Sequence, residues 1–210
     1  MSGRAAEGTG EPFAADARET AAEADNTVDD DLIAAAVGGS DDAFDRLLRR
    51  HESAVLRLVR LLGVAPADRD DVAQEILVRV FRHLGTFKPG RSFRGWLYRI
   101  AVNAVHDHRY RLGRRARRES PWDAGLHDVP DAAQAPGEHA IARDRRRLLE
   151  EALVGLSERE RAVFVLVELE GLERREAART LGITAVTVRR HLSRANASLR
   201  KILAESEKKT

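Results

Sequence analysis

The fold is decided above all by residues 171–201, which have the sequence GLERREAARTLGITAVTVRRHLSRANASLRK. Ala177 and Ala178 are small, as two closely crossing helices require, and Gly182 stands where a tight turn needs a residue without a side chain. The stretch therefore predicts a helix-turn-helix. Its final helix, from Ala185 to Lys201, has four arginines, one lysine and no acidic residue. A solvated helix face usually mixes charges, so this composition favours DNA binding over a merely solvated arginine face.

The composition of the whole chain agrees with a helical protein. Of its 210 residues, 43% are hydrophobic, 33% are charged and only 5% are aromatic, which favours helices over a β-sandwich. The chain contains no cysteine. This excludes disulfides, thiolate metal sites and cysteine nucleophiles, and it fits a cytoplasmic protein. No apolar run approaches the roughly 20 residues of a membrane span, so we expect neither membrane insertion nor a secretory signal.

Hydrophobic periodicity and charge divide the chain into four parts. Residues 1–27 are rich in Ala, Glu and Gly, and we expect a disordered acidic extension there. Residues 28–112 have apolar positions at helical spacing and predict a compact helical domain. Residues 113–140 contain three prolines and three glycines and predict a linker, and helical spacing resumes over residues 141–205. The sequence therefore predicts an all-α fold of two small domains joined by a flexible linker.

A second segment whose residues could bind nucleic acid lies at residues 92–103, with the sequence SFRGWLYRIAVN. A basic tail follows, in which six of the ten residues from Arg109 to Arg118 are arginine. Cations interleaved with tyrosines are typical of a surface for single-stranded or distorted DNA. We interpret Trp96 first as a core residue and second as a stacking residue. Asn103 is either a polar residue at the rim of the core or a base reader, and its spacing leaves both open.

A third pattern, DVAQEILVR at residues 71–79, places polar side chains on the outer side of an amphipathic helix. Spacing alone leaves two alternatives, a solubilising face with internal ion pairs or a face that docks a protein. Acid-base chemistry by Asp71 and Glu75 has little support, and His106 and His108 are two residues apart, so they make a poor metal pair. We therefore expect no catalytic residues, no metal and no cofactor, and a protein that is not an enzyme.

Four motifs taken together resemble a known family. DxxQE at 71–75, FRGWLYRIAxN at 93–103, LSER at 156–159 and GIxxxTV at 182–188 follow one another as in extracytoplasmic-function (ECF) sigma factors. These are small two-domain members of the bacterial sigma-70 class, and the resemblance covers about residues 28–112 and 141–204. It implies a dissociable, non-catalytic subunit of bacterial RNA polymerase. It also implies an anti-sigma factor that holds the protein inactive.

The resemblance assigns roles to three sets of residues. The set that would dock on core polymerase comprises Asp71, Gln74, Glu75, Val78 and Arg79. The set that would bind the minus-ten promoter element comprises Lys88, Arg91, Ser92, Phe93, Arg94, Arg99, Asn103, Arg109 and Arg111, and Asn103 matches the position that reads a flipped base. The set that would bind the minus-thirty-five element as duplex DNA comprises Thr187, Arg189, Arg190, Ser193 and Arg194.

The sequence also departs from the family pattern. Val186 stands where the family commonly has glycine, so we do not transfer a promoter preference from relatives. The acidic N-terminal part of the chain is unusually long, with eleven acids and two arginines between Met1 and Asp42. We hypothesise that the acidic extension at residues 1–27 competes for the basic patches. The alternative function is a free-standing helix-turn-helix regulator that binds duplex DNA without polymerase. A helical metal-dependent enzyme would need a carboxylate or histidine cluster that the sequence does not offer.

Overall fold

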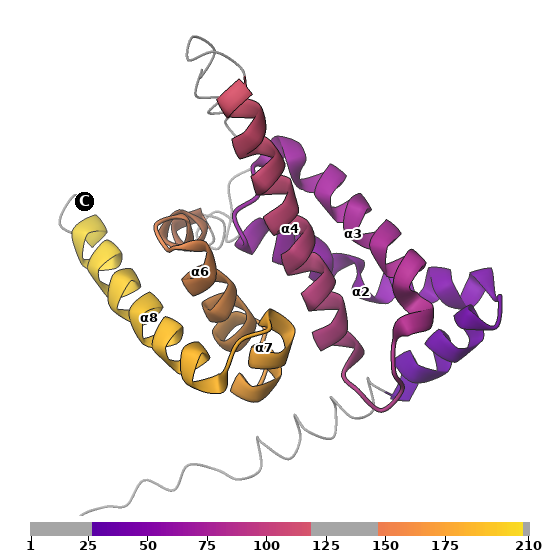
Figure 1. Ribbon diagram of the computed structural model, residues 1–210. Coiled ribbons are helices and arrows are strands. Elements are labelled where there is room, and N and C mark those ends of the chain that lie inside the picture. The colour runs from indigo at the N-terminus through magenta and orange to yellow at the C-terminus, as the bar shows by residue number, and fades with distance from the viewer. Residues whose placement is uncertain (1–26, 119–146, 208–210) are drawn as a thin grey trace, which may run out of the picture.

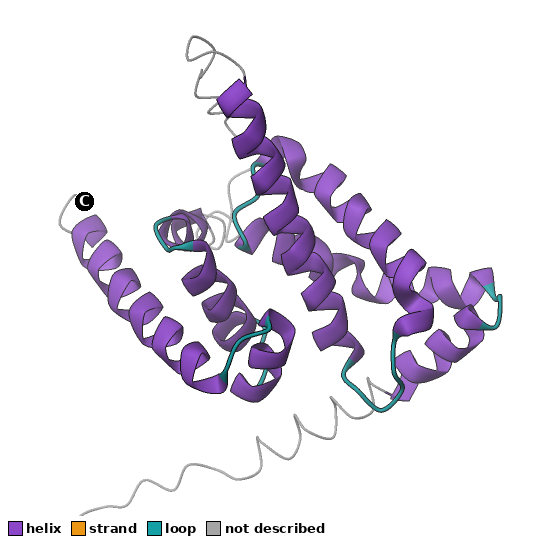
Figure 2. Cartoon of the chain, viewed as in Figure 1, coloured by secondary structure: helices purple, strands orange, loops and turns teal. Residues whose placement is uncertain are grey.

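The computed structural model describes residues 27–118 and 147–207, which form helices joined by short turns (Figures 1 and 2). Within these two ranges there is no β-strand, and the prediction of an all-α fold is confirmed. The expected acidic extension up to residue 26 and the expected linker from residue 119 onward lie outside the described residues. None of the described helices is long and apolar enough to cross a membrane.

The first half of the molecule is a bundle of four helices. They are a helix at residues 27–37, α2 (Asp41–Leu61), α3 (Arg69–His83) and α4 (Phe93–Arg118). Ser92 caps α4 as predicted, because its hydroxyl accepts a hydrogen bond of 3.0 Å from the amide of Gly95. The helix continues to Arg118, beyond the expected end of the first domain at residue 112. A glycine inside a helix costs only about 1 kcal/mol, and the arginines and alanine that follow Gly113 favour helix.

The second half comprises a helix at residues 147–154, α6 (Glu158–Phe164), α7 (Arg174–Leu181) and α8 (Ala185–Glu207). A π-helical turn, Val165–Leu169, extends α6. Gly182 has φ 64°, the left-handed conformation that glycine adopts without strain, and its amide bonds back to the end of α7. The turn between α7 and α8 is therefore tight, and the predicted helix-turn-helix is present.

The start of α6 offers a direct test of local stability. Ser157 and Glu160 form a capping box, in which each side chain accepts from the backbone amide of the other. Replacing Ser157 with alanine leaves one amide of the first turn without its partner, and we expect the free energy of unfolding to fall by about 1 kcal/mol. Urea unfolding measures this change. The matched control is Ser53→Ala at an exposed position inside α2, which should cost no stability.

The two halves share one hydrophobic core. Buried side chains of α2, α3 and α4, such as Leu58 and Leu97, belong to the same contiguous cluster as Leu153, Leu166 and Ala195 of the second half. Helix α7 packs against α4, as Figure 1 shows. A smaller cluster lies within the second half and fixes α8 on α6 and α7; it comprises Val163, Ala178, Val188 and Leu192. The halves therefore pack side by side, an arrangement that the sequence does not predict.

Candidate nucleic-acid and protein interfaces

The outer face of α3 carries the residues predicted to dock on polymerase. Asp71, Gln74 and Val78 are exposed, while Glu75 and Arg79 are half-buried. The opposite face, with Val72, Ala73, Ile76 and Val80, is buried in the core. The helix therefore presents the predicted docking residues to solvent as one stripe.

The apolar spacing of the helix predicts that Phe81 is buried in the core, but this prediction is wrong, because the side chain extends the exposed stripe. Its side chain is 62% exposed, and its ring meets the ring of Phe44 edge-on at 5.0 Å. Val78, one turn earlier, is 41% exposed. Large apolar side chains that stay exposed side by side are typical of a protein interface. Phe81 is thus a candidate docking residue that the sequence pattern did not reveal.

Ion pairs connect the docking face of α3 to α4. Glu75 accepts from Arg79 at 2.5 Å and from Arg111 of α4 at 2.6 Å, and Arg79 also donates to Asp107 at 2.8 Å. The hydrogen bond from Arg111, together with that from Arg79, outweighs desolvation and lowers the pKa of Glu75. Arg111, predicted to bind DNA, is therefore engaged by a residue predicted to bind protein.

The loop before α4 borders a cavity of about 620 Å³ that lies between this loop, α4 and α7. Ser92 of the predicted minus-ten set lines it, and so do four basic residues: Lys88, Arg91 and Arg99 of the same set and Arg179 of α7. All four basic side chains are exposed. The cavity thus has the positive charge that a nucleic-acid strand requires.

Aromatic side chains support the loop from within the core. Phe93 was predicted to contact DNA, but it is only 1% exposed, with its ring centre 5.5 Å from those of both Phe87 and Trp96. In this arrangement Phe93 does not reach the cavity, and it positions the loop instead. Trp96 is half-buried, packs on Phe93 and lines the cavity, which fits both parts of its interpretation.

The remaining predicted minus-ten residues of α4 face the second half. Asn103 lines a second cavity, of about 220 Å³, opposite Arg159, Leu181 and Ile183. Arg109 lies 3.5 Å from Glu158 of α6, and it also donates a hydrogen bond to the carbonyl of Leu62 in its own half. Part of the α4 face that was predicted to bind DNA therefore turns toward the second half, although the Asn103 side chain stays exposed.

A buried carboxylate lies at the centre of this contact. Glu170, whose side chain is 0% exposed, accepts two hydrogen bonds from Arg57 of α2, at 2.9 and 2.7 Å. It accepts a third from the Tyr98 hydroxyl at 2.5 Å, and Arg94 donates to its backbone carbonyl at 2.6 Å. Sequence reasoning missed this cluster, because Arg57 and Glu170 are far apart in the chain and each resembles an ordinary surface residue.

The electrostatics of the cluster follow from burial and pairing. Burial alone would raise the pKa of Glu170, but the hydrogen bonds from Arg57 and Tyr98 outweigh it, and the pKa lies below its ordinary value. Burial, with the hydrogen bond to Glu170, raises the pKa of Tyr98 to about 12. The carboxylate is thus charged and the phenol neutral near pH 7.

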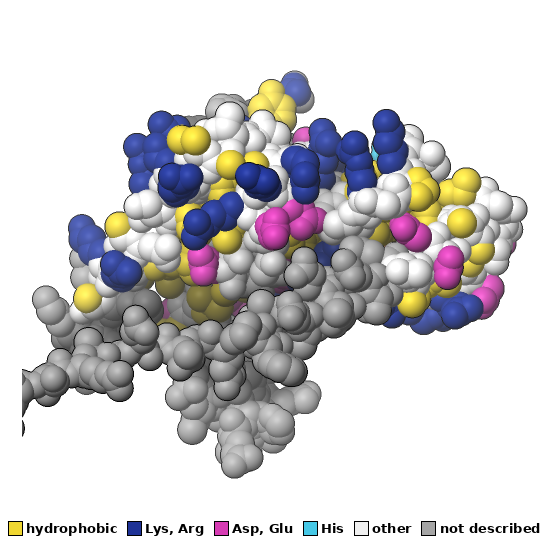
Figure 3. All heavy atoms as spheres, turned by 90° about the horizontal axis from the view of Figure 1, so that it is seen from below, with side chains coloured by type: hydrophobic (Ala, Val, Ile, Leu, Met, Phe, Trp, Pro, Cys, Tyr) yellow, Lys and Arg dark blue, Asp and Glu magenta, His cyan; other side chains and the backbone are white. Residues whose placement is uncertain are grey.

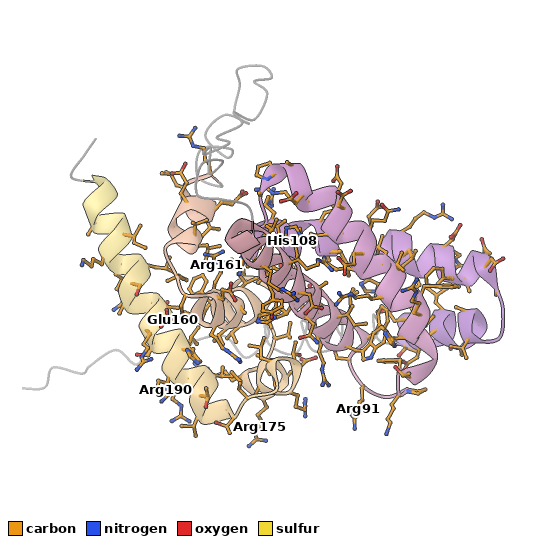
Figure 4. All side chains as sticks on the ribbon, turned by 45° about the horizontal axis from the view of Figure 1, so that its top comes forward. Arg91, His108, Glu160, Arg161, Arg175 and Arg190 are labelled. Atoms are coloured by element: carbon orange, nitrogen blue, oxygen red, sulfur yellow. The ribbon has the colours of Figure 1, made fainter. Side chains whose placement is uncertain are left out.

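A second polar contact is made by Arg161 of α6, which lies between the halves in Figure 4. It is 7% exposed and donates to the carbonyls of Leu153 at 2.7 Å, Val154 at 2.8 Å and Leu156 at 3.3 Å. It also donates to the carbonyl of Leu62 in the first half at 2.9 Å. A guanidinium stays protonated in proteins, so burial that lowers the pKa of Arg161 leaves it charged.

Helix α8 presents the predicted minus-thirty-five residues. Thr184 caps it by accepting from the amide of Thr187 at 3.1 Å. Arg189, Arg190, Ser193 and Arg194 are exposed and Thr187 is half-buried, while Val188 and Leu192 on the opposite face are buried. Val186 is 70% exposed, so its side chain stands where α8 would approach DNA.

The basic residues of both halves lie on a common side. Figure 3 shows lysine and arginine side chains spread over the two halves with a few acidic side chains between them. In Figure 4, Arg91 of the loop, Arg175 of α7 and Arg190 of α8 point outward along one edge. Within the described ranges, no group of three or more metal-ligating side chains is present.

Comparison with known proteins places the chain in a family. Residues 47–115 match Sigma-70 region 2, and residues 146–199 match Sigma-70 region 4. The chain is 36% identical over 177 residues to the ECF RNA polymerase sigma factor SigM of Mycobacterium tuberculosis (strain ATCC 25618 / H37Rv), covering 83% of this chain and 84% of SigM. It is 35% identical over 184 residues to the RNA polymerase sigma factor CnrH of Cupriavidus metallidurans, covering 84% and 95%.

Solved structures agree with these matches. CnrH in complex with the cytosolic domain of CnrY superposes with a TM-score of 0.62 at 30% identity, over 85% of this chain and 98% of CnrH. The sigma factor RpoE of Bartonella quintana, in complex with the anti-sigma factor NepR, has the same fold, with a TM-score of 0.65 at 22% identity over 77% and 96%. The chain therefore belongs to the sigma-70 family and is an ECF sigma factor. The alternative of a free-standing regulator is not favoured.

Proposed function

We propose that the chain binds bacterial core RNA polymerase through the outer face of α3 and directs it to promoters with two recognition elements. The observation that carries this proposal is the separation of three surfaces on one chain: an exposed docking stripe, a basic cavity beside α4, and the arginine face of α8. The protein acts as a non-catalytic subunit in the cytoplasm, as its sigma-factor relatives suggest.

Docking is supported by the character of the α3 face. Asp71 and Gln74 supply polar contacts at one end, and Val78 and Phe81 supply an apolar patch at the other. Interfaces commonly combine an apolar centre with a polar rim. A solubilising face would have no need of an exposed phenylalanine beside an exposed valine.

The loop and α4 bind the minus-ten element after the strands separate. The cavity between this loop, α4 and α7 offers Lys88, Arg91 and Arg99 for phosphates and Trp96 for stacking. Extruding a base costs a few kcal/mol, which a pocket that holds the base must offset. Asn103 lines the second cavity rather than this one, and its exposed amide can read the edge of a base that reaches it there.

Helix α8 binds the minus-thirty-five element in the major groove. Arginine side chains there pair with guanine edges in two-point contacts, and Ser193 and Thr187 reach phosphates or bases. The exposed Val186 adds an apolar contact at the start of the helix, so the preferred sequence should differ from that of relatives with glycine there.

An anti-sigma factor is the expected regulatory partner. The relative RpoE was solved with the anti-sigma factor NepR, and CnrH was solved with the cytosolic domain of CnrY. Both relatives superpose on most of this chain, and we infer that a protein of this kind holds the present chain inactive.

Run-off transcription tests the proposal. Core polymerase and a promoter library of random sequence are incubated with and without the protein, and the transcripts are sequenced. Transcripts that require the protein and share two spaced upstream motifs would support a sigma factor. Binding to duplex DNA by the protein alone, with no transcripts, would contradict it.

Asn103 gives a sharper prediction for base recognition. We expect Asn103→Ala to relax preference at one minus-ten base by about 1–3 kcal/mol, because a two-point amide contact discriminates by that amount. Transcription from promoters varied at each minus-ten position measures the effect. Leu112→Ala, at an exposed position on the same helix but outside this cavity, is the control and should leave preference intact. An equal loss on every promoter would refute base reading by Asn103.

A further inference from the structure

We propose that Val186, in the first turn of α8, recognises a thymine of the minus-thirty-five element through the methyl group of that base. The inference rests on the proposed binding of α8 in the major groove, and it goes beyond that proposal by naming the base and the chemical group. Val186 thereby becomes a specificity-determining residue, next to the polar side chains already assigned to this helix.

Val186 is exposed on a helix whose neighbouring apolar side chains are buried. Its exposed fraction is 70%, whereas those of Val188 and Leu192 are 0% and 5%. Among the side chains of α8 that the structure describes, it is the only large apolar one that is exposed. Single exposed apolar residues are common on protein surfaces, so the position of Val186 on the helix decides what it does.

That position is within the row of residues expected to contact DNA. Residues three, four and seven positions apart lie on one face of a helix, so Val186 shares a face with Arg189, Arg190 and Ser193. All of them are exposed, and Figure 4 shows Arg190 pointing outward. The first residues of a recognition helix are those that approach base edges most directly. Val186 therefore faces the groove that the arginines would enter.

The first turn of α8 presents this side chain in a fixed orientation. The Thr184 hydroxyl accepts a hydrogen bond of 3.1 Å from the amide of Thr187 and lies 2.9 Å from the Thr187 hydroxyl. Val188 is fully buried and fastens the turn to the core. Valine itself is restricted to essentially one side-chain rotamer in a helix. Its two methyl groups can therefore contact a base with little loss of conformational entropy.

Thymine is the base whose major-groove edge matches an apolar side chain. The other three bases offer hydrogen-bond donors and acceptors there, and thymine adds a C5-methyl group. Covering a donor or acceptor with valine leaves it without a partner and costs free energy. Contact between valine and the thymine methyl group instead removes apolar surface of both from water. Burial of one such group corresponds to about a fourfold change in affinity.

The test removes the methyl group from the DNA. Run-off transcription with core polymerase first defines the minus-thirty-five sequence, and each thymine on either strand of this element is then replaced by uracil. Uracil lacks the methyl group but keeps the hydrogen-bonding pattern, and the element lies upstream of the transcript, so the RNA is unchanged. Thymine and uracil promoters with transcripts of different length compete for limiting holoenzyme. With the parent chain, we expect one replacement to lower the transcript ratio about fourfold.

Val186→Ser removes the apolar group from the protein. With this variant, the thymine and uracil promoters should compete equally at the position that distinguished them for the parent. Val154→Ser makes the same change at a valine that is 60% exposed at the end of the helix at residues 147–154, and it should keep the fourfold preference. Because the ratio is measured within each variant, a general loss of activity cancels.

Three results would overturn the proposal. The first is a parent chain for which no uracil replacement changes the ratio, or a minus-thirty-five element without thymine on either strand. The second is an equal preference for thymine in Val186→Ser and in the parent, which would assign the effect to another residue or to DNA shape. The third is loss of the preference in Val154→Ser as well. A complete absence of transcripts would instead reject the proposed function, whereas transcripts without a methyl effect reject only the contact by Val186.

Discussion

Replacing Arg161 with methionine is expected to lower the free energy of unfolding by about 3 kcal/mol. The guanidinium is buried and donates to four backbone carbonyls. Hydrogen bonds to charged groups contribute about 1.5–3 kcal/mol each, and losing them leaves buried acceptors unpaired. Part of the loss is offset because methionine avoids the desolvation cost of a buried charge. Urea unfolding monitored by circular dichroism gives the difference.

Arg159→Met is the matched control for this change. It makes the same replacement two positions earlier, where the side chain is exposed, and should alter stability by less than about 0.5 kcal/mol. Arg161→Lys should fall between the two, because an ammonium cannot reach carbonyls on several sides at once. If Arg161→Met were as stable as Arg159→Met, the hydrogen bonds from Arg161 to the four carbonyls would not stabilise the fold.

The second large effect concerns docking. We expect Phe81→Ser to weaken binding to core polymerase about 30-fold or more, since removing an aromatic anchor from an interface commonly costs about 2 kcal/mol or more. The fold should survive, because the ring is largely exposed. Fluorescence anisotropy of the labelled protein with purified core polymerase measures the affinity, and run-off transcription should fall in parallel at limiting protein.

Leu148→Ser separates docking from a general loss of apolar surface. Leu148 is 50% exposed and lies in the second half, far from the α3 stripe in sequence. This variant should bind core polymerase as the parent does. Equal binding by Phe81→Ser and the parent would remove Phe81 from the docking surface, and weakening by both variants would show that the effect is not specific to α3.

Local features of the fold were predictable from the sequence because they depend on neighbouring residues. The serine of a capping box, the glycine of a tight turn and the spacing of apolar residues along α8 each act within a few positions. The family resemblance added the roles of the three surfaces, which spacing alone had left open. Those roles remain proposals at the level of single residues.

The packing between the halves was not predictable in the same way. Arg57 and Glu170 lie on elements that no local pattern connects, and in the sequence each resembles a solvated charge. Phe81 illustrates the opposite error. An apolar residue at helical spacing is normally buried, but α3 projects this one beside Phe44, where the described core does not cover it. Burial depends on which neighbours the whole fold supplies.

The chemistry of the two polar contacts determines how the packing between the halves responds to acidity. Glu170 has a lowered pKa, so its contribution is complete above the ordinary carboxyl range and is lost only as acidity reaches that lowered pKa. Tyr98 titrates at about 12, and the guanidinium of Arg161 bonds to carbonyls, which do not titrate. Neither contact changes its protonation between about pH 5 and pH 9. A change of acidity within this range therefore leaves both of these contacts between the halves intact.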